Sequence, residues 1–237
     1  MTTGRKRDSD DRRAPRVLIA VPTRDMTAAA ISGRLALLLV DLARRRESPA
    51  IEIVPGHPVD RVRNLICARF LESDADYLLM IDDDVVPPAT ILDMARRDKD
   101  VVAGLCYAFV PFLGYYSVAY PPGGEDGARA QRLGIGRDLE FRGLLEVELV
   151  GSACMLVHRR VLEALDPPYF KMELDDDRLH IEDSEDFTFC RKVREAGFSI
   201  WLDTDQPCGH HKALDMRASV RWAQEHAARQ RPADLDP

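Results

Sequence analysis

The sequence lacks most of the short motifs that would assign a function directly. No G-x-G-x-x-G follows the first apolar run and no G-x-x-x-x-G-K-[ST] occurs anywhere, which excludes the two common glycine-rich phosphate loops. There is no C-x-x-C pair, so neither a zinc ribbon nor a thioredoxin-like redox motif is expected. No apolar run approaches the roughly 18–20 residues that a membrane span needs. The charged N-terminus shows no signal-peptide pattern.

Charge and cysteine content narrow the class of protein further. The net charge is −7, with 33 basic and 40 acidic residues intermixed, so the basic surface of a nucleic-acid binder is not expected. The five cysteines are scattered and odd in number, which favours reduced thiols in a cytoplasmic protein. A chain of 237 residues that is 46% apolar can bury one sizeable core, and it shows no internal repeat or linker.

The first half of the sequence alternates two kinds of segment. Residues 1–14 are charged and nearly devoid of apolar side chains, which predicts a disordered tail before a single domain over 15–230. Apolar runs that suit buried strands alternate with amphipathic runs that suit helices. The expected strands are 16–23, 50–54, 77–81 and 100–107, and the expected helices are 27–46, 59–73 and 88–96. This alternation predicts an α/β fold with a doubly wound, mostly parallel sheet.

The second half is less regular. After about residue 110 the chain is rich in Gly, Pro and Tyr, which indicates loops and short strands that form a smaller mixed part. Residues 144–165 then predict a strand, a turn at Gly151–Ser152, another strand and a short helix. Residues 182–204 predict a helix ended by a glycine, followed by a strand. Residues 213–230 predict a C-terminal helix with an inward stripe made of Met216, Val220, Ala223 and Ala227.

The segment Y-L-L-M-I-D-D-D-V-V-P-P, residues 77–88, sends an apolar strand directly into three carboxylates. In an extended chain, side chains two apart share a face, so Asp82 and Asp84 are expected to point together and Asp83 away. Two close carboxylates repel unless a cation lies between them, and Mg²⁺ or Mn²⁺ suits such oxygen ligands. Ligands of open α/β sheets bind beyond the carboxyl ends of the strands. The motif therefore predicts a divalent metal site, with a solvated acidic turn as the alternative.

Taken in order, six segments resemble those of the GT-A glycosyltransferases, and are most similar to the bacterial family-2-like enzymes with an Asp-x-Asp motif. They are V-L-I-A-V-P-T, R-N in the second helix, Y-L-L-M-I-D-D-D-V-V-P-P, V-G-S-A-C-M-L-V-H-R-R-V-L-E-A-L, S-E-D-F-T-F-C-R-K-V-R-E-A-G-F and G-H-H-K, over residues 16–212. The resemblance implies the GT-A fold and a nucleotide-diphosphate sugar donor of UDP or GDP type. It also implies a divalent metal, Mn²⁺ or Mg²⁺, and a carbohydrate or other hydroxyl acceptor. A homo-oligomer is compatible with it.

The resemblance also implies roles for individual residues. Asp84 would be a metal ligand, with Asp82 near the ribose or the metal, and His210 would complete the metal shell, with His211 as the spare. The residues expected at the nucleotide or donor are Pro22, Thr23, Arg24, Arg63, Asn64, Asp82 and Asp83, and those expected at the sugar are Gly151 and Ser152.

The acidic segment E-D-S-E-D-F, residues 182–187, would carry the catalytic carboxylates. The resemblance implies that Asp186 is the general base and that Glu185 lies at the acceptor or donor sugar. Without the resemblance, acidic residues at this position would ordinarily cap a helix. Glu182–Asp183 is a second acidic pair, so the alignment could be displaced by one repeat. A retaining glycosyltransferase of the same fold and a non-catalytic nucleotide-sugar-binding module stay open as alternatives. A nucleotidyltransferase is disfavoured because residues 21–30 hold no glycine.

The sequence departs from the family after the second strand. An acidic residue that reads uracil is often found there, whereas this chain has Pro55, Gly56 and His57. The resemblance divides the domain into a nucleotide-binding half over 15–108 and an acceptor and sugar half over 109–212. The segment 109–145, with Tyr115, Tyr116 and Tyr120, would shape the acceptor site.

Overall fold

The computed structural model of the chain describes residues 14–24, 29–45, 49–110, 114–122, 143–177, 181–211 and 216–229. The expected tail lies outside the described residues except for Ala14, and so does much of the segment 109–145.

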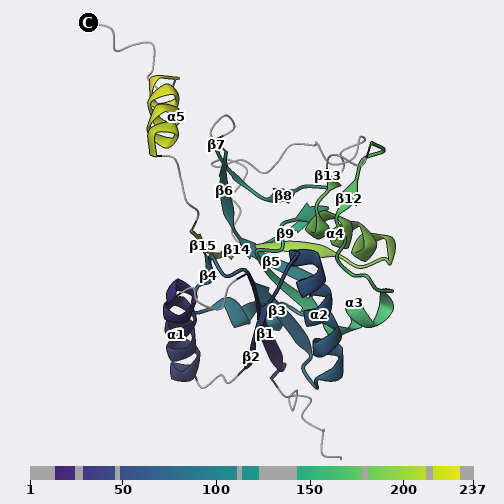
Figure 1. Ribbon diagram of the computed structural model, residues 1–237. Helices are drawn as coiled ribbons and strands as arrows, with labels where there is room; N and C mark the ends of the chain where they lie inside the picture. Colours follow the sequence, from purple (N-terminus) through teal and green to yellow (C-terminus); the bar gives the residue numbers. More distant parts are fainter. Residues whose placement is uncertain are drawn as a thin grey trace, which may run out of the picture.

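A seven-stranded sheet forms the centre of the molecule (Figure 1). In spatial order its strands are β2 (Ala50–Pro55), β1 (Val17–Thr23), β3 (Tyr77–Ile81), β11 (Cys154–His158), β5 (Val101–Leu105), β14 (Ile200–Pro207) and β9 (Leu144–Val147). Strand β11 runs antiparallel to both of its neighbours and β9 antiparallel to β14, and the remaining pairs are parallel. The sheet takes strands from both expected halves, and their functional division stays a prediction.

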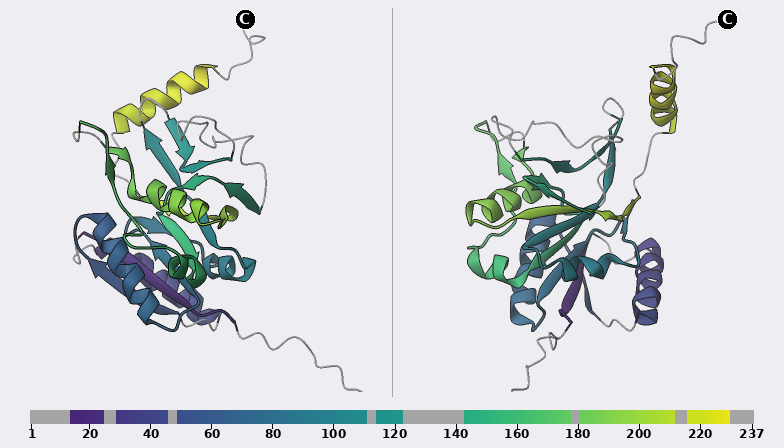
Figure 2. Two further views of the ribbon diagram at one scale, coloured as in Figure 1. Left: turned by 90° about the vertical axis from the view of Figure 1, so that its right-hand side faces the viewer. Right: turned by 180° about the vertical axis from the view of Figure 1, so that it is seen from behind.

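Helices cover both faces of this sheet, so its central strands are buried on both sides (Figures 1 and 2). One face packs on α2 (Val59–Glu72), α3 (Arg159–Ala164) and α4 (Glu185–Glu195), and the other on α1 (Ala29–Arg44) and η1 (Ile91–Arg97). Alternation along β3 sends Leu78 and Met80 into the first core and Leu79 into the second, and all three are fully buried. The helix expected over 88–96 is a 3₁₀ helix, η1, that begins three residues later.

The described residues also form four two-stranded ribbons outside this sheet. They pair β4 (Val85–Val86) with β15 (Gly209–His210), β6 (Tyr107–Val110) with β7 (Gly114–Ser117), β8 (Ala119–Tyr120) with β10 (Leu149–Val150), and β12 (Glu173–Leu174) with β13 (Ile181–Asp183). The β4–β15 ribbon matters most for the site, because it joins the segment after β3 to the segment after β14.

The C-terminal helix α5 (Met216–Arg229) stands apart from the sheet in all three ribbon views (Figures 1 and 2). The inward stripe expected on this helix is wrong for Met216 and Val220, which are 68% and 50% exposed, and for Ala223, which is also exposed. The side chain of Ala227 lies outside the described residues. The helix projects away from the sheet, and its half-buried residues are instead Ala218, Ser219 and Trp222.

Within the described ranges no helix is both long enough and apolar enough to cross a membrane. All five cysteines are free and buried.

Candidate functional site

A cavity of about 440 Å³ lies at the carboxyl ends of β1, β2 and β3, where ligands of open α/β sheets bind. Its wall is made by the end of β1, the turn after β2, the start of α2, the three aspartates after β3 and Glu185 of α4. We refer to it as the first cavity. It brings together the expected residues Pro22, Thr23, Arg24, Arg63, Asp82, Asp83, Asp84 and Glu185.

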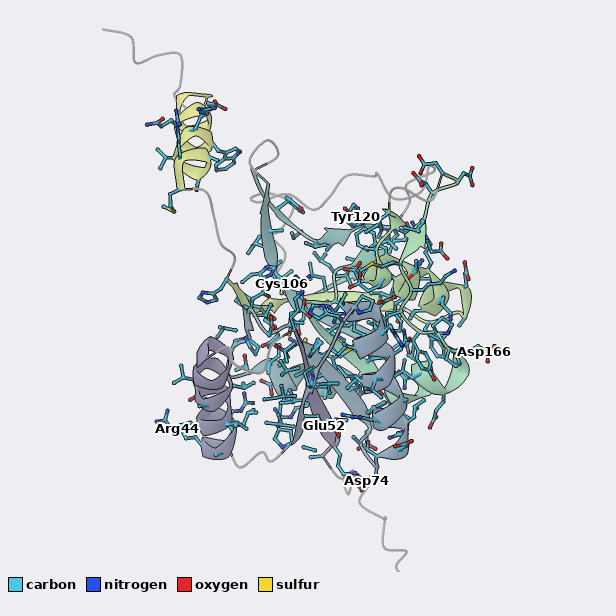
Figure 3. The ribbon with its side chains drawn as sticks, in the orientation of Figure 1. Arg44, Glu52, Asp74, Cys106, Tyr120 and Asp166 are labelled. Atoms are coloured by element: carbon cyan, nitrogen blue, oxygen red, sulfur yellow. The ribbon has the colours of Figure 1, made fainter. Side chains whose placement is uncertain are left out.

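A second cavity of about 190 Å³ adjoins the first one and shares Arg63, Asp82 and Glu185 with it. Asp186, Gly151, Ser152 and His210 line it, together with Cys106, which Figure 3 labels near the centre of the molecule. The two cavities therefore gather every expected site residue except Asn64.

The three aspartates do not follow the alternation expected of a strand. The chain turns directly after Ile81, and the turn is closed by a hydrogen bond from the Val85 amide to the Asp82 carbonyl at 3.0 Å. Asp82 and Asp84 were expected to share a face without Asp83, whereas this turn places all three aspartates among the residues that line the first cavity. The hydroxyl of Thr23 donates to Oδ2 of Asp83 at 2.8 Å, so the end of β1 holds this carboxylate in place.

The β4–β15 ribbon brings Asp84 and His210 together. Nε2 of His210 lies 3.4 Å from Oδ1 of Asp84, and the two side chains are 10% and 28% exposed. Nδ1–H of His210 donates to the carbonyl of Tyr107 at 2.8 Å, which orients the ring and leaves Nε2 as the nitrogen directed at Asp84. His211 is exposed, and its backbone amide donates to the carbonyl of Asp84 at 2.9 Å.

The chemistry of this pair fits a hard divalent cation. A carboxylate and an imidazole whose other N–H is bonded to a carbonyl form an ordinary partial set of metal ligands. Among the residues that the structure describes, no group of three or more His, Cys, Asp or Glu is placed to hold a metal ion. Mg²⁺ and Mn²⁺ commonly fill their remaining positions with water and substrate phosphate, so two protein ligands suffice for such a site.

Arg63 lies between the two acidic motifs and is only 3% exposed. Its Nη2 donates to Oδ1 of Asp82 at 2.8 Å, and its Nε lies 3.5 Å from Oε1 of Glu185. Burial alone would lower the pKa of the guanidinium, but the carboxylates of Asp82 and Glu185 raise it above its ordinary value. Arg63 therefore stays charged.

Glu185 sits at the start of α4, where both cavities meet, and is 9% exposed. Burial and the neighbouring charge of Asp186 raise the pKa of its carboxyl, against the opposing effect of Arg63. The carboxyl of Glu185 therefore titrates closer to neutral pH than that of an exposed glutamate does.

Asp186 has one fixed oxygen and one available oxygen. Its Oδ1 accepts hydrogen bonds from the hydroxyl of Ser184 and from the Phe187 amide, the latter at 3.0 Å. Its Oδ2 lies 3.6 Å from the point where a Cβ on Gly151 would stand, on the wall of the second cavity. A carboxylate held through one oxygen and open through the other has the geometry that a general base requires.

Gly151 is needed for this approach of the chain. A Cβ there would lie 3.0 Å from Cγ1 of Val118, so a larger residue would displace the wall of the second cavity. Ser152 beside it is 2% exposed and lines the same cavity.

Asn64 does not reach either cavity. Its amide donates to the carbonyls of Asp60 and Phe170, at 2.8 and 2.7 Å, and its oxygen accepts from the Tyr169 and Phe170 amides. The structure places Asn64 in a hydrogen-bonded anchor between α2 and the segment 169–170, where these four contacts use the whole amide.

Asp183, of the alternative acidic pair, is not among the residues that line either cavity. Asp183 ends β13 and forms an ion pair with Arg191, and the side chain of Glu182 lies outside the described residues. The residue before α4 is Ser184, so Asp183 is not its N-cap.

Tyr120, labelled in Figure 3, is one of the tyrosines expected to shape the acceptor site; it is 4% exposed and packs edge-on against Phe187 at 5.3 Å between ring centres. The side chain of Tyr115 is not among the described ones.

Two contacts of the candidate site were not predicted from the sequence. The carbonyl of Tyr107 orients His210, and a backbone group carries no signal in the sequence. The hydroxyl of Ser184 holds Asp186, and its position just before an acidic helix start was the available sign.

Comparison with solved structures shows a shared fold. No protein-family model matches the sequence, and no curated protein matches it. Protein A197 from STIV is similar in structure, with 22% identity, a TM-score of 0.52, and coverage of 84% of this chain and 86% of that one. A mutant of Drosophila beta-1,4-galactosyltransferase 7, in complex with manganese, UDP-Gal and xylobiose, aligns with 16% identity and a TM-score of 0.47, covering 93% and 82%.

A third solved structure is a glycosyltransferase involved in glycosylation of the major capsid of PBCV-1, with 10% identity and a TM-score of 0.47. The alignment covers 89% of this chain and all of that one. The sheet topology and the likeness to A197 confirm the expected fold class, an α/β chain with a doubly wound, mostly parallel sheet and a smaller mixed part.

Proposed function

We propose that this chain is a metal-dependent glycosyltransferase that moves a sugar from a nucleotide-diphosphate donor to a hydroxyl acceptor, with inversion at the anomeric carbon. One observation carries the proposal. The aspartates after β3, the Glu185–Asp186 pair and His210 come from three separate segments, yet they border two adjoining cavities at the carboxyl edge of the sheet.

The first cavity would hold the nucleoside diphosphate. Pro22, Thr23 and Arg24 form its wall at the end of β1, and Thr23 holds Asp83, whose carboxylate suits ribose hydroxyls. Asp84 and His210 would hold Mn²⁺ or Mg²⁺, which supplies charge neutralisation for the diphosphate leaving group. With its carboxylate bonded to Arg63, Asp82 is better placed to support the site than to bind the metal itself.

The second cavity would hold the sugar and receive the acceptor. Asp186 takes the proton of the acceptor hydroxyl on Oδ2 as the hydroxyl oxygen attacks the anomeric carbon. The bond from that carbon to the diphosphate oxygen breaks, and the diphosphate leaves with the electron pair. Glu185 lies one residue away and would bind a hydroxyl of the sugar or the acceptor.

The expected surroundings of the enzyme belong to the same proposal. Five free, buried cysteines support a reducing compartment such as the cytoplasm. A carbohydrate or other hydroxyl compound is the partner that the second cavity suits, and nucleic acid is not expected on an acidic chain. A homo-oligomer is compatible with the proposal.

A thermal-shift panel of UDP, GDP, ADP and CDP, each with and without Mn²⁺, tests the proposed function. Metal-dependent stabilisation by at least one of them is expected, because a ligand that binds only the folded state stabilises it. If no nucleotide stabilises the chain with Mn²⁺ or Mg²⁺ present, the donor site is wrong. Binding without transfer would favour a non-catalytic module, and NMR of the product anomer separates inversion from retention.

A further inference from the structure

A single buried arginine joins the two acidic motifs of the site. Arg63 projects from α2, Asp82 follows β3 and Glu185 begins α4, so three elements meet at one guanidinium. The distances are 2.8 Å from Nη2 to Asp82 and 3.5 Å from Nε to Glu185. Arg63 is 3% exposed, and a charge at that depth is kept only when it is paired.

The guanidinium is also held from behind. Its central carbon lies 5.9 Å from the ring centre of Phe170, which stacks on Phe189 of α4 at 4.5 Å. The next residue on α2, Asn64, binds the backbone of Phe170 through both its amide nitrogen and its oxygen. The R-N pair therefore acts as a unit: Asn64 fixes the aromatic support, and Arg63 rests on it while reaching both carboxylates.

The competing role for Arg63 is direct contact with the donor. Arg63 borders both cavities, and its Nη1 is buried with no hydrogen-bond partner among the described residues. If Arg63 binds the donor, its substitution should mainly lower the affinity for the donor. If Arg63 is a positioning residue, its substitution should mainly change the position and the pKa of the carboxyl groups that it contacts.

We propose that Arg63 is the positioning residue of this site, which fixes the Asp82 carboxylate and the Glu185 carboxylate at one set distance from each other across the two cavities. This inference rests on the proposed function for its catalytic meaning, and the arrangement itself is measurable without any substrate.

The first experiment observes Glu185 directly. The charged groups facing it are Asp186 on its own helix, Arg63 on α2 and Asp82 after β3. In ¹³C-labelled protein, the side-chain carboxyl resonance of Glu185 is assigned by its loss in Glu185→Gln and followed against pH. In Arg63→Gln, the midpoint is expected to rise by about one pH unit or more, because an opposite charge at this distance has been removed.

Two further variants make this measurement decisive. Arg63→Lys restores the charge and is expected to return the midpoint most of the way to the wild-type value. Arg61→Gln removes an exposed arginine from the same helix and is expected to leave it unchanged. A folded Arg63→Gln with an unmoved Glu185 midpoint overturns the proposal. If Arg63→Gln does not fold, Arg63→Lys is compared with the wild type alone. Because one ammonium cannot hold both carboxylates as the guanidinium does, a small rise of the Glu185 midpoint is expected to remain, and an unchanged midpoint overturns the proposal.

The second experiment separates positioning from binding. With a donor found in the nucleotide panel, Arg63→Gln is expected to lower kcat by about 100-fold, since small displacements of reacting groups have effects of that size, with KM for the donor nearly unchanged. A rise in KM at constant kcat would make Arg63 a donor ligand instead. A panel in which no nucleotide binds would refute the proposed function, while the Glu185 titration would still decide the role of Arg63.

Discussion

Nε2 of His210 lies 3.4 Å from Oδ1 of Asp84, although β15 and β4 are two-residue strands that come from distant parts of the chain. The pairing of Val85 with His210 across this ribbon sets the distance. The proposed metal site therefore depends on a backbone pairing as well as on two side chains, and both can be tested.

Replacement of Asp84 by Ala should abolish the metal-dependent part of nucleotide binding. At a nucleotide concentration of about 100 times Kd, binding stabilises the wild type by about 2.7 kcal/mol, or roughly 5–10 °C in Tm for a chain of this size. Thermal shift with Mn²⁺ should show this rise in the wild type and not in Asp84→Ala. Asp166→Ala is the control, since Asp166 is exposed and lies at the periphery in Figure 3. An undiminished Mn²⁺-dependent shift in Asp84→Ala would rule out the metal role.

His210 and His211 should differ sharply in their effect on the metal. His210→Ala removes the imidazole that faces Asp84, so the Mn²⁺ concentration needed for half-maximal stabilisation should rise by about 10- to 100-fold. His211→Ala changes an exposed side chain and should have little effect. Titration of Mn²⁺ at a fixed nucleotide concentration gives the comparison, and a larger effect at His211 would reverse the assignment.

Asp186→Asn should separate chemistry from binding. The amide keeps the shape of the side chain but cannot take a proton, so turnover should fall by about 10²–10⁴-fold while nucleotide binding persists. Asp183→Asn is the matched change in the other acidic pair and loses an ion pair with Arg191. Turnover and thermal shift are measured for both variants. If Asp183→Asn loses turnover and Asp186→Asn keeps it, the base has been misassigned.

Glu185 should make the chain less stable as the pH rises. Its pKa in the folded state is raised above the ordinary value of 4.5, mainly by burial, so the folded state holds this proton more tightly than the unfolded state does. The contribution is fully present below pH 4.5 and is lost as the pH rises through the folded-state pKa. Urea midpoints of wild type and Glu185→Gln, measured from pH 4 upward, should show the wild type losing stability relative to the variant. A relative gain would contradict the raised pKa.

Gly104→Ala should damage the site from within the sheet. A Cβ at this position of β5 would stand 2.8 Å from Sγ of Cys208 and 3.2 Å from the Gln206 carbonyl, both just before β15. We expect a loss of about 1–3 kcal/mol in the free energy of unfolding, together with weaker Mn²⁺ dependence. The double variant Gly104→Ala with Cys208→Ala should recover part of the loss. An unchanged free energy of unfolding in the single variant would contradict this expectation, because it would mean that Gln206 and Cys208 move aside without cost.

The sheet and its helices could be predicted because their signals are local. Continuous apolar runs such as 77–81 and amphipathic runs such as 59–73 are long enough to show a period, and their alternation leaves few topologies. The motif D-D-D predicted a candidate site at the edge of the sheet, because it directly follows a buried strand.

The finer geometry depended on contacts that leave no period in the sequence. Asp83 lines the first cavity at a turn of the chain, which the strand rule of alternation does not describe. In the sequence, Arg63 cannot be told from an exposed charge on a helix. It is buried because α4, which carries Glu185, packs beside α2. The ribbon of β4 and β15 is too short to show a pattern, and Met216 and Val220 of α5 are exposed although their spacing is that of a buried stripe.

The β4–β15 ribbon has a consequence for synthesis of the protein. Asp84 leaves the ribosome long before His210, and the two can meet only after β14, the last strand of the sheet in chain order, has been made. A nascent or truncated chain that stops before residue 209 therefore carries the aspartate motif without the imidazole that faces it. In this way the proposed capacity to bind metal arises only after residue 210 has been synthesised and β15 has paired with β4.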